Sequence, residues 1–154
     1  MNEEKFSNVT TLFHSMLLAY QIALRDILGT GRVVFVRPAL ENFAKINEAT
    51  GVHLVKGKSL DEAFRNLSKT MKVLGLVKDF RFEKLGTQKY IVHVDDCIWA
   101  PETHKQLNTK NLVCPLALIA MSIVQAHSNN KVKVIDSEYF ERGTKTRIES
   151  VKPK

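Results

Sequence analysis

The stretch DFRFEKLGTQKYIVHV, residues 79–94, decides the fold because its hydrophobic pattern repeats every two residues. Phe80 and Phe82 alternate with charged residues, and a similar alternation resumes after the turn signal at residues 85–87. Alternation of this period on both sides of a turn predicts an antiparallel β-hairpin.

The turn also suggests a register for this hairpin. If Lys84 pairs with Gln88, Phe82 lies opposite Tyr90 on one face, and the polar residues on the other face form compatible pairs. We therefore predict a three-residue turn.

The residues before the hairpin carry the helical period. Ser59 and Glu62 have the spacing of a capping box and are followed by apolar residues three and four apart, which predicts a helix. Two further helices are predicted upstream, over residues 9–28 and 38–51, the second beginning at its proline. The β-branched run at residues 33–36 fits either a helix or a strand.

The residues after the hairpin supply one more helix and a second hairpin. A helix is predicted over residues 115–127 with Cys114 as its N-cap, because a proline at the first helical position is well tolerated. A hairpin over residues 132–151 turns near Gly143. The predicted fold class is α+β: helices packed on an antiparallel sheet made of two hairpins, in a single small-molecule-binding-like domain of residues 1–154.

Composition limits the classes of protein that the chain can belong to. It has 154 residues, of which 44% are hydrophobic and 25% charged, which is typical of a folded domain rather than a disordered one. Its two cysteines are too few for a disulfide scaffold, so we expect a cytoplasmic protein. The longest apolar stretch, residues 112–124, is shorter than the about 18 residues that a membrane span needs.

The predicted helix over residues 9–28 carries more apolar surface than one packing partner can cover. Its polar face is marked by His14, Gln21 and Arg25, so we expect His14 at the surface. Leu17 and its neighbours widen the apolar stripe, so the helix should contact a ligand or a second chain as well as its own core. The stripe expected to face inward contains Val9, Leu12, Phe13, Met16, Tyr20, Ala23, Leu24 and Ile27.

This apolar surplus leads to the first functional hypothesis, a non-catalytic domain that binds a small hydrophobic molecule. The helix over residues 115–127 is apolar nearly all round, so it should be buried on several sides and form part of the pocket. The residues expected to bind the ligand are Phe13, Met16, Leu17, Phe80, Phe82, Trp99, Cys114, Leu116, Ala120 and Met121.

An enzyme is the less favoured class, because the sequence has no phosphate loop, zinc-protease motif or nucleophile elbow. Cys114 is the best candidate for a reactive group, since a helix N-terminus lowers the pKa of a thiol. A cysteine among apolar neighbours is, however, more often a small buried hydrophobic residue.

No cofactor is expected, although one group of residues has ligand types that zinc accepts. These are His93, Cys97, His104 and Cys114. Their spacing fits no standard zinc finger, and an ion pair with Asp79 on the neighbouring strand accounts for His93.

Two other functions remain open. The apolar surplus could be buried in a homodimer, as in a dimeric interaction or scaffold protein. Alternatively, the protein could bind a nucleic acid through its formal charge of +7 and the basic residues near the C-terminus, although acidic residues between them dilute the positive charge.

The order of several short motifs resembles the 4-vinyl reductase domain family, also described as hydrocarbon-binding. The matching pieces are ALRDILG at residues 23–29, Leu74 with Gly75, VCPL at residues 113–116, and Glu138 with Gly143. The resemblance covers residues 22–151 and implies a fold like that of heme nitric-oxide-binding domains and transport-particle subunits. It also implies a small-molecule-binding domain that is often dimeric, with some members linked to tetrapyrrole metabolism or the sensing of aromatic compounds.

The chain departs from this family pattern at two places. Many members have cysteines in the final hairpin, whereas this chain has Phe140 and Thr146 there, which argues against a zinc site of the family type. The tyrosine-serine-arginine signature of the heme-binding relatives is also missing, because serine is absent after Tyr20 and Arg25 comes one residue too late. We therefore do not expect heme.

Overall fold

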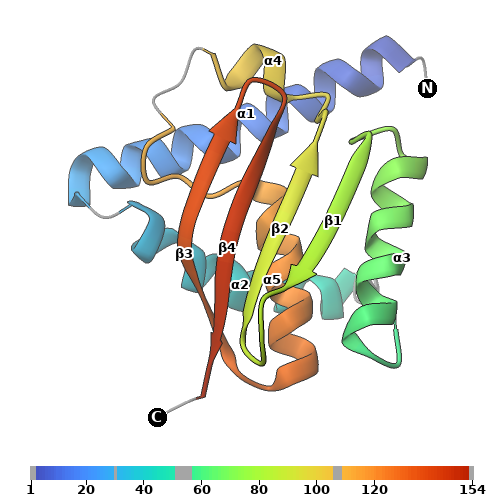
Figure 1. Cartoon of the computed structure of the whole chain (residues 1–154). Helices are drawn as coiled ribbons and strands as arrows, with labels where there is room; N and C mark the ends of the chain where they lie inside the picture. Colours follow the sequence, from blue (N-terminus) through green and yellow to red (C-terminus); the bar gives the residue numbers. More distant parts are fainter. Residues whose placement is uncertain (1–2, 30, 51–56, 106–108, 153–154) are drawn as a thin grey trace.

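The computed structural model describes residues 3–29, 31–50, 57–105 and 109–152, which form helices and one antiparallel sheet (Figure 1). The predicted α+β fold class is confirmed. The elements are α1 (Glu3–Leu28), α2 (Gly31–Thr50), α3 (Leu60–Val73), β1 (Asp79–Lys84), β2 (Lys89–Asp95), α4 (Ala100–Thr103), α5 (Pro115–Ser128), β3 (Lys131–Phe140) and β4 (Gly143–Val151).

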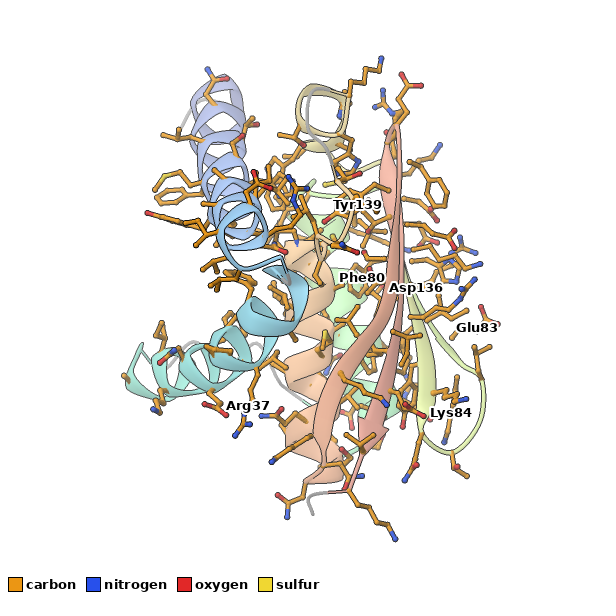
Figure 2. The ribbon with its side chains drawn as sticks, turned by 90° about the vertical axis from the view of Figure 1, so that its left-hand side faces the viewer. Arg37, Phe80, Glu83, Lys84, Asp136 and Tyr139 are labelled. Carbon is orange, nitrogen blue, oxygen red and sulfur yellow. The ribbon has the colours of Figure 1, made fainter. Side chains whose placement is uncertain are left out.

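The two hairpins join into one sheet of four strands in the order β1-β2-β4-β3. The joint is the antiparallel pairing of β2 with β4, so β1 and β3 form the two edges. Helices α1, α2 and α5 cover one face of the sheet, and α3 lies beside β1 (Figure 1). Figure 2 shows Phe80 between the sheet and the helices and Glu83 on the opposite, polar side of the sheet.

The register of the first hairpin differs from the prediction by two residues. Lys84 pairs with Tyr90 rather than with Gln88, and Phe82 pairs with Val92. A shift of two residues keeps every side chain on the same face, so the hydrophobic pattern could not distinguish the two registers. In the observed register, Arg81 forms ion pairs with Asp79 at 2.8 Å and with Asp95 at 2.6 Å.

Helix α2 begins at Gly31, seven residues before the predicted start, and contains Pro38 in its interior. The ambiguous run at residues 33–36 is therefore helical. Val36 and Leu40, one turn apart, are buried in the core, whereas Pro38 lies on the exposed side. Core packing thus overrides the break that a proline favours.

Helix α1 buries the face that was predicted to be exposed. His14, Leu18 and Gln21 are buried, whereas Phe13 is 61% exposed and Ile27 is 78% exposed. The expectation that His14 lies at the surface and that Gln21 lies on the solvent face was wrong. Both polar side chains have partners in the fold that the helical pattern does not reveal: His14 stacks on an aromatic ring and Gln21 bonds to a distant backbone.

The predicted ends of α3 and α5 are confirmed. The Ser59 side chain accepts a hydrogen bond from the Glu62 backbone N–H at 3.2 Å, and the Glu62 carboxylate accepts one from the Lys58 N–H at 2.9 Å. Cys114 is the N-cap residue of α5, which begins at Pro115. These local signals fix where the two helices begin.

Candidate functional site

Helices α1, α2 and α5 and Trp99 line a cavity of about 360 Å³ that opens to solvent past the exposed side chains of Phe13 and Ile46. Among the described residues that line it, none is charged, and only His14, Asn42 and Trp99 carry polar side-chain atoms. The lining residues are Phe13, His14, Leu17, Phe35, Ala39, Leu40, Asn42, Phe43, Ile46, Trp99, Pro115, Leu116, Leu118 and Ile119. A volume and composition of this kind are typical of small-molecule sites.

The sequence builds this cavity because α5 is apolar on more than one side. Ala117, Ala120 and Val124 are completely buried in the core, whereas Leu118 and Ile119 are only partly buried and line the cavity. Helix α2 supplies the opposite wall from residues at helical spacing. The bulky side chains of α2 and α5 that line the cavity leave a space between these two helices.

His14 and Trp99 stand side by side in one wall of the cavity. The His14 ring stacks on the Trp99 indole, with centroids 4.8 Å apart and an interplanar angle of 27°. His14 is only 3% exposed. Burial, and secondarily repulsion from His104, lowers the pKa of His14 to about 4, so this imidazole is neutral at pH 7.

The ring nitrogens of this stacked pair have no hydrogen-bond partner among the described residues. This applies to Nδ1 and Nε2 of His14 and to Nε1 of Trp99. A buried polar atom without a partner costs about 1–3 kcal/mol, so such groups call for an explanation. A neutral imidazole offers one donor and one acceptor, and the indole offers one donor. Because these nitrogens are themselves buried, the surface that the cavity presents is almost entirely apolar.

The structure brings four of the ten predicted ligand-binding residues to this cavity: Phe13, Leu17, Trp99 and Leu116. Met16 lies on the exposed side of α1. Three others are buried in the core and do not line the cavity, namely Cys114, Ala120 and Met121. The remaining two, Phe80 and Phe82, line a separate groove of about 530 Å³ beside α3.

The sequence reasoning missed the contribution of α2. Phe35, Ala39 and Phe43 line the cavity, and each is four residues from the next. This spacing was present in the sequence, but it crosses Pro38, where the helix was expected to begin. His14 was missed because it lies at helical spacing with Gln21 and Arg25, a pattern that favours a solvent-facing side.

The residues considered for zinc are distributed over both sides of the sheet. His93 contacts the Glu83 carboxylate at 3.2 Å on the polar side, and His104 Nδ1 lies 2.7 Å from the Phe140 carbonyl oxygen. Cys97 and Cys114 are buried free thiols. Within the described ranges, no three histidine, cysteine or acidic residues lie close enough to hold a metal ion.

Burial also decides the chemistry of the two thiols. It raises the pKa of Cys97 to about 12 and raises the pKa of Cys114 above its ordinary value. The expected lowering of the Cys114 pKa by the helix N-terminus is thus wrong, because loss of solvation outweighs it. Both sulfurs are protonated thiols at neutral pH.

The basic residues of the second hairpin lie among acidic partners. Lys133 pairs with Glu149 at 2.7 Å, and Arg147 pairs with Asp136 at 2.5 Å. These pairs reduce the local positive charge that a phosphate backbone would need. In the described ranges, no helix combines the length and apolar character needed to cross a bilayer.

Comparison with known proteins gives a remote structural likeness. No family model matches the chain, that of the 4-vinyl reductase domain included, and no curated protein is significantly similar to it in sequence. It is similar to a solved structure described as "Probing the function of heme distortion in the H-NOX family". The two share 8% identity, with 87% of this chain and 70% of that chain covered at a TM-score of 0.42, which says nothing of what this chain binds.

Proposed function

We propose that this protein is a binding domain for a small, uncharged, mainly apolar molecule, held in the cavity between α1, α2 and α5. The observation that carries the proposal is the cavity itself, which is large enough for a small ligand and walled by apolar side chains. The resemblance of the sequence to hydrocarbon-binding domains agrees with it.

The uncharged lining limits the ligand further. A charged group in this cavity would lose its hydration without gaining an opposite charge, because none of the described lining residues is charged. His14 is neutral at pH 7, so it adds no charge to the wall. The ligand should therefore be neutral and mainly apolar.

A matched pair of fluorescent probes tests this. N-phenyl-1-naphthylamine is neutral, and its 8-sulfonate differs from it by one negative charge. We expect the neutral probe to bind with increased fluorescence and the sulfonate to bind at least about tenfold more weakly. Trp99 is the only tryptophan of the chain and lines the cavity, so energy transfer from it shows that the probe is bound to the protein.

Variants confirm or reject the location. Ala39→Trp places a large ring into the cavity and should abolish binding of the neutral probe, whereas Ala126→Trp on the exposed side of α5 should leave it unchanged. Equal binding by both variants would reject this cavity as the site. Failure of both probes to bind the unmodified protein would reject the proposed function.

A second candidate function is a homodimeric interaction domain, and the exposed face of α1 favours it. Four apolar side chains on this face are between 42% and 78% exposed, and each lies four or seven residues from the next, which places them along one side of the helix. They are Leu12, Met16, Tyr20 and Ile27. An apolar stripe of this length on a monomer is typical of a contact surface. A second copy would bury the stripe by pairing the α1 helices.

Analytical sedimentation measures whether the protein is a dimer. We expect a dimer whose dissociation constant rises at least about tenfold in Met16→Glu and Tyr20→Glu, because each places a charge in the stripe. Thr70→Glu, on the exposed side of α3, is the matched control and should not change the dissociation constant. A monomer at all concentrations would exclude the homodimer.

A further inference from the structure

A second hollow lies at the edge of the sheet, between α3 and β1, apart from the cavity described above. Figure 1 shows α3 beside this edge strand. Phe64, Phe80 and Phe82 form the apolar part of the groove, and Arg65 and Lys69 lie on its α3 side. A groove between an edge strand and a helix is a common place for an extended peptide to bind as an additional strand.

The backbone of β1 is available for such pairing at its Phe82–Lys84 end. The Leu85 N–H donates to the Lys89 carbonyl at 2.9 Å, so these two residues form a hydrogen-bonded pair of the hairpin. Because such pairs alternate along an antiparallel ladder, the backbone groups of Phe80, Phe82 and Lys84 point away from β2, toward the open edge.

One hydrogen bond agrees with this direction. The Ser68 hydroxyl of α3 donates to the Phe80 carbonyl at 2.7 Å, which requires that carbonyl to face α3. Among the described residues, no partner is found for the outward backbone groups of Phe82 and Lys84. This end of the edge therefore offers donors and acceptors to an incoming strand.

The helical wall of the groove has an excess of positive charge. Arg65 and Lys69 are exposed, and neither has an ion-pair partner among the residues that the structure describes. Lys72, the next basic residue on this wall, is engaged with Asp79 at 2.5 Å. Asp61 is the one acidic side chain among the described lining residues, so the groove favours an anionic occupant.

We propose that this groove binds an extended acidic segment of a partner protein, which adds to β1 as an antiparallel or parallel strand. The dimensions agree with this occupant. Arg65 and Lys69 are four residues apart on a helix, about 6 Å along its axis. Alternate residues of a strand repeat at about 6.7 Å, which is close to this spacing. Lys72 contacts Asp79, and Phe64 stacks on Phe82. Arg65 is therefore the cation nearer to the free end of the edge, and Lys69 lies toward Phe80.

The same geometry disfavours a single-stranded nucleic acid, which would be the other polyanion to consider. Such ligands bind by stacking bases on free aromatic faces. Here Phe64 is 5% exposed and Phe80 is 2% exposed. The Phe64 and Phe82 rings already stack on each other, with their centroids 3.4 Å apart. The groove offers backbone groups and cations rather than open rings.

Fluorescence polarisation with two labelled peptides tests the proposal on the full chain. In one peptide glutamate alternates with valine, and in the other lysine replaces each glutamate. We expect only the acidic peptide to bind. Reversing both charges, Arg65→Glu with Lys69→Glu, should weaken its binding by at least about tenfold.

A matched double variant, Lys131→Glu with Lys152→Glu, changes the net charge equally but lies away from the groove, and it should keep the affinity. Amide hydrogen exchange adds a structural readout: exchange at Phe82 and Lys84 should slow when the acidic peptide binds. Three results would overturn the proposal: no binding of the acidic peptide, equal loss of affinity in both double variants, or binding of polyuridylate in place of the peptide without protection of these amides. None of these depends on ligand binding in the α1–α2–α5 cavity.

Discussion

The side-chain amide of Gln21 bonds twice to the backbone of Val113, although 92 residues separate them in the sequence. Its Nε2 donates to the Val113 carbonyl at 2.9 Å, and its Oε1 accepts from the Val113 N–H at 2.8 Å. Gln21 is completely buried. This pair fixes α1 to the segment that leads into α5, and so fixes two walls of the cavity relative to each other.

Replacing Gln21 by leucine should strongly destabilise the fold. The substitution leaves the N–H and the carbonyl of Val113 buried without partners, which should reduce the free energy of unfolding by about 2–4 kcal/mol. Urea denaturation measures this change in the free energy of unfolding. Gln88→Leu, in the hairpin loop, is the control and should change the free energy by less than about 0.5 kcal/mol. Equal effects of the two substitutions would show that the Gln21 hydrogen bonds contribute nothing.

The stability of the protein should fall as the pH drops from about 6.5 to about 4. Burial lowers the pKa of His14 from 6.5 to about 4, so between these values the unfolded chain takes up a proton that the folded chain does not. Stability is therefore unaffected above the unfolded pKa and decreases by about 3 kcal/mol by the time the folded pKa is reached.

The His14→Phe variant isolates this contribution, since other groups also titrate in acid. Phenylalanine keeps the stacking on Trp99 and removes both unpaired ring nitrogens. We expect the free energy of unfolding of this variant to depend less on pH than that of the unmodified protein, by about 3 kcal/mol between pH 7 and pH 4. An identical pH dependence of the two proteins would disprove the assignment to His14.

Both thiols should be unreactive in the folded protein. Cys97 is 4% exposed and Cys114 is 3% exposed, and burial raises the pKa of each. Reaction with a thiol reagent at pH 8 should be negligible without denaturant and should consume two thiols per chain in urea. Rapid reaction of one thiol in the native state would contradict this prediction and show that Cys114 or Cys97 is reactive.

The sequence by itself determined the elements whose signals are local. The capping box at Ser59, the Cys114–Pro115 helix start and the alternation around Phe80 each lie within a few residues of the structure that they specify. Local backbone preferences and the strand period decide such features, because they do not depend on what packs against them. The fold class followed from the order of these elements.

Only the tertiary structure decided the face of α1, the start of α2 and the hairpin register. The apolar stripe of α1 is longer and wider than its polar one, yet the fold buries His14 and Gln21 because Trp99 and Val113, far away in the sequence, supply their contacts. Pro38 is accepted inside α2 because Val36 and Leu40 gain a place in the core. The cavity depends on all three helices, and its residues come together only when long-range contacts set how those helices lie against one another.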